Sequence, residues 1–418
     1  MLRPESPPWP FEIEALRAEF PALSQEVNGK PLVYLDSAAS TLKPQAVIDA
    51  LSHYYAYDHS NVHRGAHALA DRATAAFEAA RDSVARFLRG PGGLVRRVEV
   101  IWTRGTTEAI NLVAQSWGSA NLGPGDEVLI SEMEHHANIV PWQLACERTG
   151  ATLKVIPVTD SGELDFEAFE TLLSERTKLL AVTHVSNVLG TVNPVAELIR
   201  AAHGVGAKVL IDGAQAVAHL DLDLKALDAD FYVFSGHKLY GPTGIGVLYG
   251  KYDLLAAMPP WQGGGEMIDR VSFEGTTFQA PPFRFEAGTP HIAGAVGLGA
   301  AIEWFTGLDQ EALRAHEHAV FAELDALLRA FPGVTVIGSA PERCGAVSFL
   351  LDGAHPSDVG AFLDQAGVAV RTGHHCCQPL MSRYGVSGTV RASLGLSSTA
   401  AALERLRAAL EQAKRFCL

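Results

Sequence analysis

Seven short apolar runs recur between residues 98 and 249, and a more polar segment separates each from the next. They are VEVIW, EVLIS, TLKVIP, KLLAVT, AKVLID, DFYVF and GIGVLY. Runs this short and this rich in β-branched residues are typical of strands buried on both faces. After the first run, apolar residues recur every three to four positions between Ala109 and Trp117, which predicts a helix with one apolar face. The alternation predicts βαβ units and therefore an α/β fold with a mostly parallel sheet of seven strands.

The last two runs are joined by SGHKLYGPT, which is too short to contain a crossover helix. One strand at that end is therefore expected to be antiparallel, so the sheet is mixed. From about Val334 the strands VTVIG, AVSFL and VAVR alternate with helices near residues 357–365 and 399–416, which predicts a smaller α+β domain. The predicted division is an N-terminal arm over residues 1–30, a large domain over 31–295 and a small C-terminal domain over 296–418.

Composition narrows the possible partners. The 418 residues include 33 Lys and Arg against 47 Asp and Glu, so the net charge is −14, and 48% are hydrophobic. A disordered chain is excluded, and nucleic acid is an unsuitable partner because phosphate binding requires a basic surface. The longest uncharged apolar stretch, between Glu286 and Glu303, is interrupted by Gly, Pro and His and is shorter than the ~20 residues that cross a bilayer. The N-terminal residues lack the apolar core of a signal peptide, so we expect a cytoplasmic protein.

The five cysteines are scattered and odd in number, so no disulfide framework is expected. Cys376 and Cys377 are adjacent, and neighbouring Cα atoms, ~3.8 Å apart, are closer than the ~4.4 Å minimum of a usual disulfide. The preceding His374 and His375 suggest zinc, but four consecutive side chains do not readily converge on one tetrahedral ion, so no metal site is predicted. The remaining interpretation is a reactive thiol at Cys376, in a Gly-containing loop with two imidazoles and Arg371 nearby.

Polar residues gather directly after five of the predicted strands, where open α/β sheets bind their ligands. They include Thr106 and Thr107, His135, Asn187, Asp212 with Gln215, and Ser235 with His237 and Lys238. Singly, such residues cap helices or face solvent, but together they offer a helix start for a phosphate, a carboxylate and a lysine. Pyridoxal 5′-phosphate requires this combination, since it binds Lys covalently and needs an acid on its pyridinium nitrogen. Dinucleotide, P-loop and nucleophile-elbow motifs are absent.

Nearly the whole chain, from YLDSAAST at Tyr34 to RASLGL at Arg391, resembles the Suf-type cysteine desulfurases of the class V aminotransferase family. The shared motifs are NVHRGAH, RGTTEAINLVA, MEHHANIVPWQ, THVSNVLGT, DGAQAV, FYVFSGHKLYGPTGIG, FRFEAGTP and RTGHHCCQPLM. The resemblance implies the fold-type I architecture of pyridoxal-phosphate-dependent transferases. The cofactor would then lie in the large domain, the catalytic cysteine loop in the small domain, and the N-terminal arm against the small domain.

The resemblance also assigns roles to individual residues. The catalytic residues correspond to Lys238, which would bind the cofactor covalently, His135, which would stack on its ring and carry protons, and Cys376, which would accept sulfur. The cofactor ring would contact Lys238, His135 and Asn187, with Asp212 at the pyridinium nitrogen and Gln215 at the phenolic oxygen. Its phosphate would contact Thr106, Thr107, Ser235 and His237. Gly288 and Thr289 would reach the phosphate from the second subunit of a homodimer. The substrate would contact Arg391, Arg371, Asn187 and Arg64.

The implied reaction converts L-cysteine to L-alanine and leaves the sulfur as a persulfide on Cys376. A small acceptor protein of the Suf system would then take this sulfur for iron–sulfur cluster assembly. A selenocysteine lyase or another reaction of the class V family is the alternative on the same fold, and a sulfur carrier or metal scaffold without catalysis is a third. The family usually has a small residue where this chain has Cys377. Cys376 remains the expected nucleophile because it directly follows the GHH motif.

Overall fold

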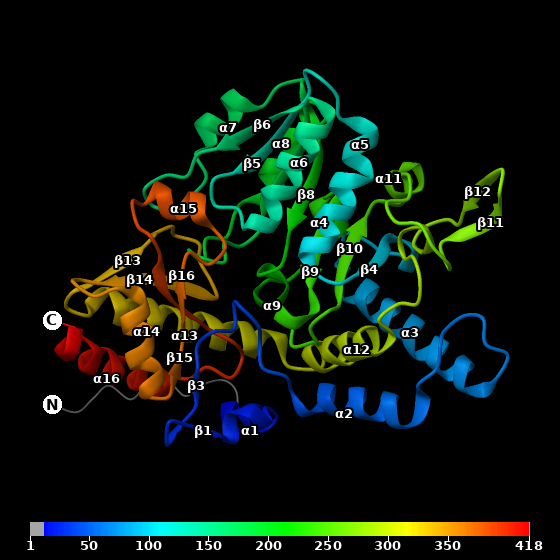
Figure 1. Ribbon diagram of the computed structural model, residues 1–418. Coiled ribbons are helices and arrows are strands. Elements are labelled where there is room, and N and C mark those ends of the chain that lie inside the picture. The colour runs from blue at the N-terminus through cyan, green and yellow to red at the C-terminus, as the bar shows by residue number, and fades with distance from the viewer. Residues whose placement is uncertain (1–11, 418) are drawn as a thin grey trace.

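The computed structural model describes residues 12–417, so the first eleven residues of the predicted N-terminal arm lie outside the described part of the chain. Its centre is a seven-stranded sheet with the order β4-β10-β9-β8-β7-β5-β6 (Figure 1). The strands are β4 (Val100–Thr103), β5 (Glu127–Ser131), β6 (Thr152–Ile156), β7 (Thr177–Thr183), β8 (Lys208–Asp212), β9 (Phe231–Ser235) and β10 (Gly246–Gly250). All seven apolar runs form strands, as predicted, and they share one sheet.

One strand of this sheet is reversed relative to the others. β5, β6, β7, β8 and β9 pair in parallel with their neighbours, whereas β10 pairs antiparallel with both β9 and β4. The connection from β9 to β10 contains only the 3₁₀ turn η5 (Gly236–Lys238), which leaves no room for a crossover helix. The prediction of a mixed, mostly parallel sheet is confirmed. The structure adds that β10 is inserted between β9 and β4.

The sheet is buried on both faces because successive apolar side chains of each strand enter different cores. In β10, Val247 and Tyr249 belong to one core, and Leu248 between them belongs to the other. The first core lies against α3 (Ala68–Phe87), α8 (Val195–Gly204) and α12 (Ile292–Thr306). The second lies against α4 (Thr106–Gln115), α5 (Trp117–Asn121) and α6 (Val140–Thr149). Two layers of helices therefore hold the strand ends in fixed positions.

The C-terminal part forms a smaller α+β unit, as predicted. Its four-stranded antiparallel sheet has the order β13 (Val334–Ile337), β14 (Ala346–Leu351), β17 (Thr389–Ser393) and β16 (Arg371–Gly373). Its helices are α13 (Gln310–Ala330), α14 (Pro356–Gln365) and α16 (Ala400–Cys417). The run VAVR is divided: β15 (Val368–Ala369) pairs in parallel with β3 (Val33–Tyr34), and β16 begins only at Arg371. A segment near the N-terminus therefore contributes to the C-terminal unit.

The remaining elements connect these layers. Before the central sheet lie α1 (Ile13–Ala18), η1 (Pro21–Ser24), β1 (Glu26–Val27), β2 (Lys30–Pro31), α2 (Gln45–His53) and the π-helical turn η2 (Tyr54–Asp58). Within and beyond it lie η3 (Arg97–Glu99), η4 (His136–Asn138), α7 (Phe166–Leu172), α9 (Ala216–His219), α10 (Leu224–Leu227), α11 (Tyr252–Ala257), η6 (Phe283–Phe285) and α15 (Gln378–Arg383). The hairpin of β11 (Ile268–Ser272) and β12 (Gly275–Phe278) projects from the body (Figure 1). Within residues 12–417, no helix has the length and apolar character needed to cross a membrane.

Candidate active site

A cavity of about 280 Å³ opens at the carboxyl ends of the parallel strands and is closed on another side by the loop that follows β16. Twelve residues predicted for the site line it: Thr106, Thr107, His135, Asn187, Asp212, Gln215, Ser235, His237, Lys238, Arg371, Cys376 and Arg391. Also in the lining are Ala38, Ala39, Ala137, Thr183, Val185, Ala214 and His375. These residues come from distant parts of the chain, so the fold assembles one site from both sheets.

The floor of the cavity is built by strand ends. Asp212 is the last residue of β8, Ser235 is the last residue of β9, and Lys238 ends the 3₁₀ turn that follows β9. β8 and β9 are adjacent parallel strands, so their carboxyl ends point to the same edge of the sheet. The carboxylate and the ammonium group are thereby brought to one place without any long connecting loop.

Burial controls the charges of this floor. It raises the pKa of the Asp212 carboxyl, although the N–H of Ala214, which donates to Oδ1 at 2.9 Å, and the charge of Lys238 oppose the shift. Burial also lowers the pKa of the Lys238 ammonium, and the charge of Asp212 opposes this shift. Each group therefore favours the charged form of the other, and Lys238 loses its proton more readily than a lysine in solvent.

A cradle of donors lies beside this pair. Helix α4 begins at Thr106, whose N–H donates to Ser235 Oγ at 2.8 Å, while the two hydroxyl oxygens lie 2.8 Å apart. Gly105 precedes the helix with a φ of 154°, and a Cβ there would lie 3.1 Å from Ser235 Oγ, so glycine permits the close approach. His237 Nδ1 is buried and has no hydrogen-bond partner among the described residues. Helix start, hydroxyls and imidazole together fit an anionic group.

His135 lies beside the same floor, between β5 and the turn η4. Its Nδ1 accepts a hydrogen bond from the N–H of Ala137 at 3.0 Å. Burial, followed by the nearby charge of Lys238, lowers the pKa of the imidazole to about 3. The ring is therefore neutral at pH 7 and carries its hydrogen on Nε2, which is free to donate.

The rim of the cavity is the loop of residues 374–377, which joins β16 to α15, and its backbone is strained. His375 and Cys376 have φ values of +51° and +57°, a left-handed conformation that is uncommon outside glycine. The loop is held by the N–H of His136, which donates to the carbonyl of Cys376 at 2.7 Å. The Asn187 side chain also donates, to the carbonyl of His375 at 2.9 Å. Such over-determined strain is typical of functional loops.

The two neighbouring thiols lie in different environments. Cys376 is exposed and lines the cavity together with Arg371 and Lys238. Cys377 is fully buried, and its Sγ donates to Asn187 Oδ1 at 3.2 Å. Burial raises the pKa of the Cys377 thiol strongly, so it stays protonated. Of these two described thiols, Cys376 is the accessible one.

Opposite this loop, Arg391 presents a buried guanidinium. It is 2% exposed, and Nη1 donates to the carbonyl of Asn187 at 2.9 Å. Asp36, in the segment after β3, lies 3.3 Å from Arg391 and 2.9 Å from Arg371, and so bridges both cations. Asp36 lies in the motif YLDSAAST, and no role is predicted for it from the sequence. His375 was likewise assigned none, although it lines the cavity and its Nε2 lies 2.9 Å from Thr389 Oγ1.

Three residues predicted for the site do not line this cavity. Gly288 and Thr289 border a separate hollow beside Trp261, and Arg64 is exposed and paired with Glu266. Gly288 and Thr289 were predicted to contact the cofactor phosphate from the second subunit of a homodimer, and Arg64 was predicted to contact the substrate. Over residues 12–417, no cluster of three or more His, Cys, Asp or Glu side chains could hold a metal ion.

Comparisons with known proteins agree with this arrangement. Residues 33–406 match the model of the aminotransferase class-V family, and the chain therefore belongs to that family. A cysteine desulfurase of Dickeya dadantii is 55% identical over 97% of this chain and 97% of its own length. A probable cysteine desulfurase of Vibrio cholerae is 54% identical over 96% of this chain and 98% of its own length.

Solved structures show the same fold. The cysteine desulfurase CsdA of Escherichia coli superposes with a TM-score of 0.89 at 42% identity, over 98% of this chain and 100% of that one. The apo cysteine desulfurase of Thermococcus onnurineus superposes with a TM-score of 0.90 at 36% identity over the full length of both chains. The predicted fold-type I architecture of the class V family is thereby confirmed.

Proposed function

We propose that the protein is a cysteine desulfurase that converts L-cysteine to L-alanine and retains the sulfur as a persulfide on Cys376. The observation that carries the proposal is that a buried lysine, Lys238, and an exposed thiol, Cys376, line one cavity together with the buried Arg391. A simple aminotransferase has no use for an exposed thiol at this place. The similarity to cysteine desulfurases over nearly the full length supports the same activity.

The cavity fits pyridoxal 5′-phosphate. Asp212 would hold its pyridinium nitrogen, Lys238 would bind it covalently, and the cradle around Ser235 and the otherwise unpartnered Nδ1 of His237 would hold its phosphate. Gln215 would contact the phenolic oxygen through the amide hydrogen that remains after it donates to the carbonyl of Ala38 at 2.8 Å. When bound, the cofactor supplies an electron sink that acidifies the Cα–H bond of an amino acid.

Arg391 positions the substrate. Its guanidinium is buried at the cavity wall, so a carboxylate can form two parallel hydrogen bonds with it away from water. Asn187 fixes the guanidinium through its carbonyl, and the same residue holds the cysteine loop through its side chain. The substrate sulfur is therefore directed toward Cys376 when its carboxylate is bound.

The residues of the chain then move the protons and the sulfur. Lys238 Nζ takes the Cα proton, because burial lowers its pKa and increases its neutral fraction. The Cys376 thiolate forms an S–S bond with the substrate sulfur while the Cβ–S bond breaks, and the electron pair of that bond stays on the substrate carbon. That carbon takes up a proton, for which His135 Nε2 is placed to exchange protons with the substrate, and Lys238 Nζ returns a proton to Cα. The products are L-alanine and a persulfide on Cys376, so atoms and electrons balance.

The finer assignments belong to the same proposal. The enzyme would be Suf-type, cytoplasmic and homodimeric, with Gly288 and Thr289 of one subunit at the cofactor phosphate of the other. A small acceptor protein would take the sulfur from Cys376 for iron–sulfur cluster assembly. The exposure of Cys376 supports the transfer of sulfur to a partner. The position of Gly288 and Thr289 outside the cavity of their own subunit supports the homodimer.

Incubation with L-cysteine, with L-selenocysteine and with a keto acid plus an amino donor tests the function. We expect equimolar L-alanine and protein-bound sulfur from L-cysteine, and no amino transfer. Alanine formed only from L-selenocysteine would identify a selenocysteine lyase. Amino transfer without sulfur release would instead identify an aminotransferase.

A further inference from the structure

The three predicted site residues that lie outside the cavity are gathered in one place. Arg64 Nε lies 3.4 Å from Glu266 Oε1, and the N–H of Gly288 donates to the carbonyl of Gly265, the neighbour of Glu266, at 2.9 Å. Thr289 follows directly. We call the group formed by Arg64, Gly265, Glu266, Gly288 and Thr289 the outlying patch. It combines a cation with a glycine turn, which suits recognition of anionic groups.

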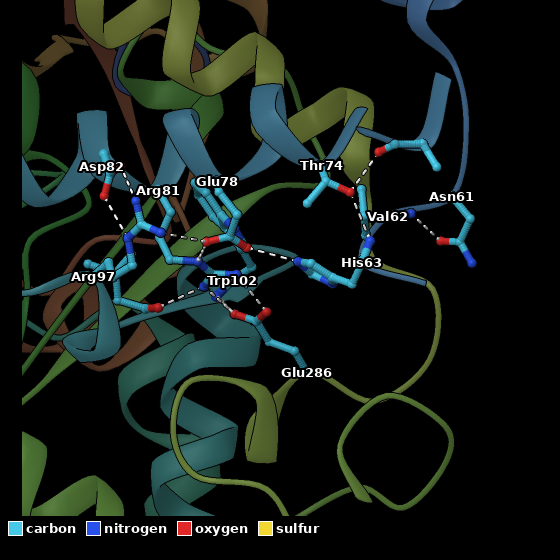
Figure 2. A network of polar contacts seen from close by, with 12 residues as sticks. Asn61, Val62, His63, Thr74, Glu78, Arg81, Asp82, Arg97, Trp102 and Glu286 are labelled. Atoms are coloured by element: carbon cyan, nitrogen blue, oxygen red, sulfur yellow. Dashed lines mark hydrogen bonds and ion pairs between the residues drawn. The ribbon is translucent and has the colours of Figure 1, made fainter. Parts of the chain in front are cut away.

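A buried ion pair holds one end of the outlying patch. Arg81 in α3 is completely buried, and its guanidinium donates to both oxygens of Glu286 at 2.7 and 2.9 Å. Glu286 also accepts the N–H of Trp102 at 2.8 Å and lies two residues before Gly288 (Figure 2). The Arg81 guanidinium lies 5.4 Å from the ring centroids of Phe77 and Trp102. The start of the segment with Gly288 and Thr289 is thereby fixed to the sheet and to α3.

The same arginine reaches the other end of the outlying patch. Arg81 Nε lies 3.4 Å from Glu78 Oε2, and Glu78 Oε1 lies 3.0 Å from His63 Nε2 (Figure 2). His63 directly precedes Arg64. A continuous series of contacts therefore joins His63, Glu78, Arg81 and Glu286, and it ends beside Arg64 at one end and beside Gly288 at the other.

Backbone strain marks Glu266 of the Arg64–Glu266 pair and the residue that precedes Arg64. His63, next to Arg64, has a φ of +70°, and Glu266 has a φ of +68°. The N–H of His63 donates to Thr74 Oγ1 at 2.9 Å, and its ring packs against Phe77 and Phe283. Non-glycine residues keep such a conformation only where the surroundings over-determine it. The network therefore holds Arg64 in a specific place although its side chain is 59% exposed.

We propose that Arg81 is a positioning residue that holds Arg64 and the Gly288–Thr289 turn in place for the cavity of the partner subunit. The proposal rests on the homodimer of the proposed function. Arginine suits this role because its planar guanidinium contacts both oxygens of Glu286 and fixes that side chain in one orientation. Its Nε lies near Glu78 at the same time. Glu286 thus acts on the turn that would bind the cofactor phosphate, and Glu78 acts through His63 on the residue that would bind substrate.

Two variants separate the two ends of the network. Arg81→Lys keeps the charge but loses the two-oxygen contact, and we expect the dissociation constant of pyridoxal phosphate, measured by visible absorbance, to rise about tenfold, with kcat at saturating cofactor within about twofold. Glu78→Gln keeps the pair between Arg81 and Glu286, and we expect KM for L-cysteine to rise about threefold with cofactor affinity unchanged. Glu303→Gln is the matched control, since Glu303 of α12 pairs with Arg86, which lies on α3 as Arg81 does, and it belongs to no contact of the outlying patch described above.

Mixed dimers test whether the network acts between subunits. A dimer of one Lys238→Ala and one Arg81→Lys subunit, purified with two affinity tags, has one cavity with Lys238. Under the proposal this cavity faces the intact patch of the other subunit, so its cofactor dissociation constant returns to the wild-type value. A dissociation constant that stays about tenfold higher would show that the network acts on its own cavity, and the proposal would be wrong.

Two further outcomes would overturn the proposal. If Arg81→Lys and Glu78→Gln lowered the thermal stability equally and changed neither the cofactor affinity nor KM, Arg81 would have a structural role alone. A monomeric wild-type protein by sedimentation would remove the partner cavity, whereas the desulfurase activity could still stand. Failure of the wild type to form alanine would overturn the proposed function instead, and the cofactor titrations would still test the network.

Discussion

The floor and the rim of the cavity differ in backbone structure and in burial. The floor, with Asp212, Ser235 and Lys238, consists of strand ends between two layers of helices, and burial shifts the pKa values of its charged groups. The rim, with His375 and Cys376, is a loop with a left-handed backbone and an exposed thiol. Under the proposed function, cofactor binding and proton transfer belong to the rigid floor. The thiol that would accept sulfur under the proposed function, Cys376, is the exposed group.

Contacts between floor and rim keep the distance between them fixed. The loop that follows β5 provides His136, whose N–H donates to the carbonyl of Cys376 and whose Nε2 accepts the N–H of Gln378 at 3.1 Å. The loop that follows β7 provides Asn187, which contacts His375, Cys377 and Arg391. The exposed thiol is therefore anchored through its backbone while its side chain stays free.

The largest effect is expected at the floor. Lys238→Ala removes both the covalent attachment of the cofactor and the base, so turnover should fall below about one-thousandth of the wild-type rate. The visible absorbance of the bound cofactor should change as well. Alanine formation and the absorbance spectrum check this, and a variant that keeps both would show that the floor is assigned wrongly.

The rim should separate sulfur transfer from cofactor binding. In Cys376→Ser the hydroxyl cannot form a persulfide, so we expect alanine formation to fall at least about a hundredfold while the absorbance stays unchanged. Cys377→Ser is the matched control, because the buried Cys377 thiol only donates to Asn187. Its activity should stay within about twofold of the wild type. The reverse result, with Cys377→Ser inactive and Cys376→Ser active, would transfer the nucleophile to the buried position.

An intermediate effect is expected at the wall between the two regions. Arg391→Lys keeps a cation but loses the bidentate geometry, so KM for L-cysteine should rise about tenfold or more, with a smaller change in kcat. The absorbance without substrate should match that of the wild type. Initial rates over a range of L-cysteine concentrations check this, and a change confined to kcat would argue against a carboxylate contact.

The smallest effect concerns stability and pH. Burial lowers the pKa of His135 and His375 to about 3 and that of His184 and His237 to about 4. In the unfolded chain a histidine has a pKa of ~6.5, so unfolding near pH 5 takes up about four protons, and the free energy of unfolding falls as the pH falls below ~6.5. Burial also raises the pKa of Glu134 to about 8. Between about pH 4.5 and 8 this carboxyl binds a proton in the folded chain and not in the unfolded chain, so it opposes the trend.

Thermal unfolding of the cofactor-free protein at pH 7.5, 6.0 and 5.0 measures this effect. We expect the midpoint to decrease toward pH 5.0. Replacement of His184 by Gln removes one of these four imidazoles. Unfolding near pH 5 should then take up about one proton fewer, so the free energy of unfolding should depend less steeply on pH. A midpoint that is constant or rises on acidification would contradict the burial of these imidazoles.

Much of the floor could be predicted from the sequence because it depends on local patterns. The seven apolar runs predict the strands. Polar residues at or shortly after the ends of neighbouring parallel strands lie at one edge of the sheet, as with Asp212 and Lys238. The insertion of β10 between β9 and β4 was not predictable in this way. Strand order depends on tertiary packing rather than on the length of one connection.

The rim and its support were harder to predict. The strand β17 was missed, and VAVR was read as one strand although β15 and β16 pair with different partners. Asp36 was missed because its contacts with Arg371 and Arg391 join residues more than 300 positions apart. Arg81 gives no signal in sequence either, since a buried arginine looks like a surface arginine on an amphipathic helix. Such long-range ion pairs are visible only in the folded chain.

The most direct test of the account is the mass of each cysteine-containing peptide after one turnover. The protein is mixed with one equivalent of L-cysteine, its thiols are alkylated, and the peptides are measured together with the alanine formed. We predict one added sulfur atom on Cys376, none on the buried Cys377, and an equal amount of L-alanine. Sulfur on Cys377, or alanine without any protein-bound sulfur, would contradict the division of work between floor and rim.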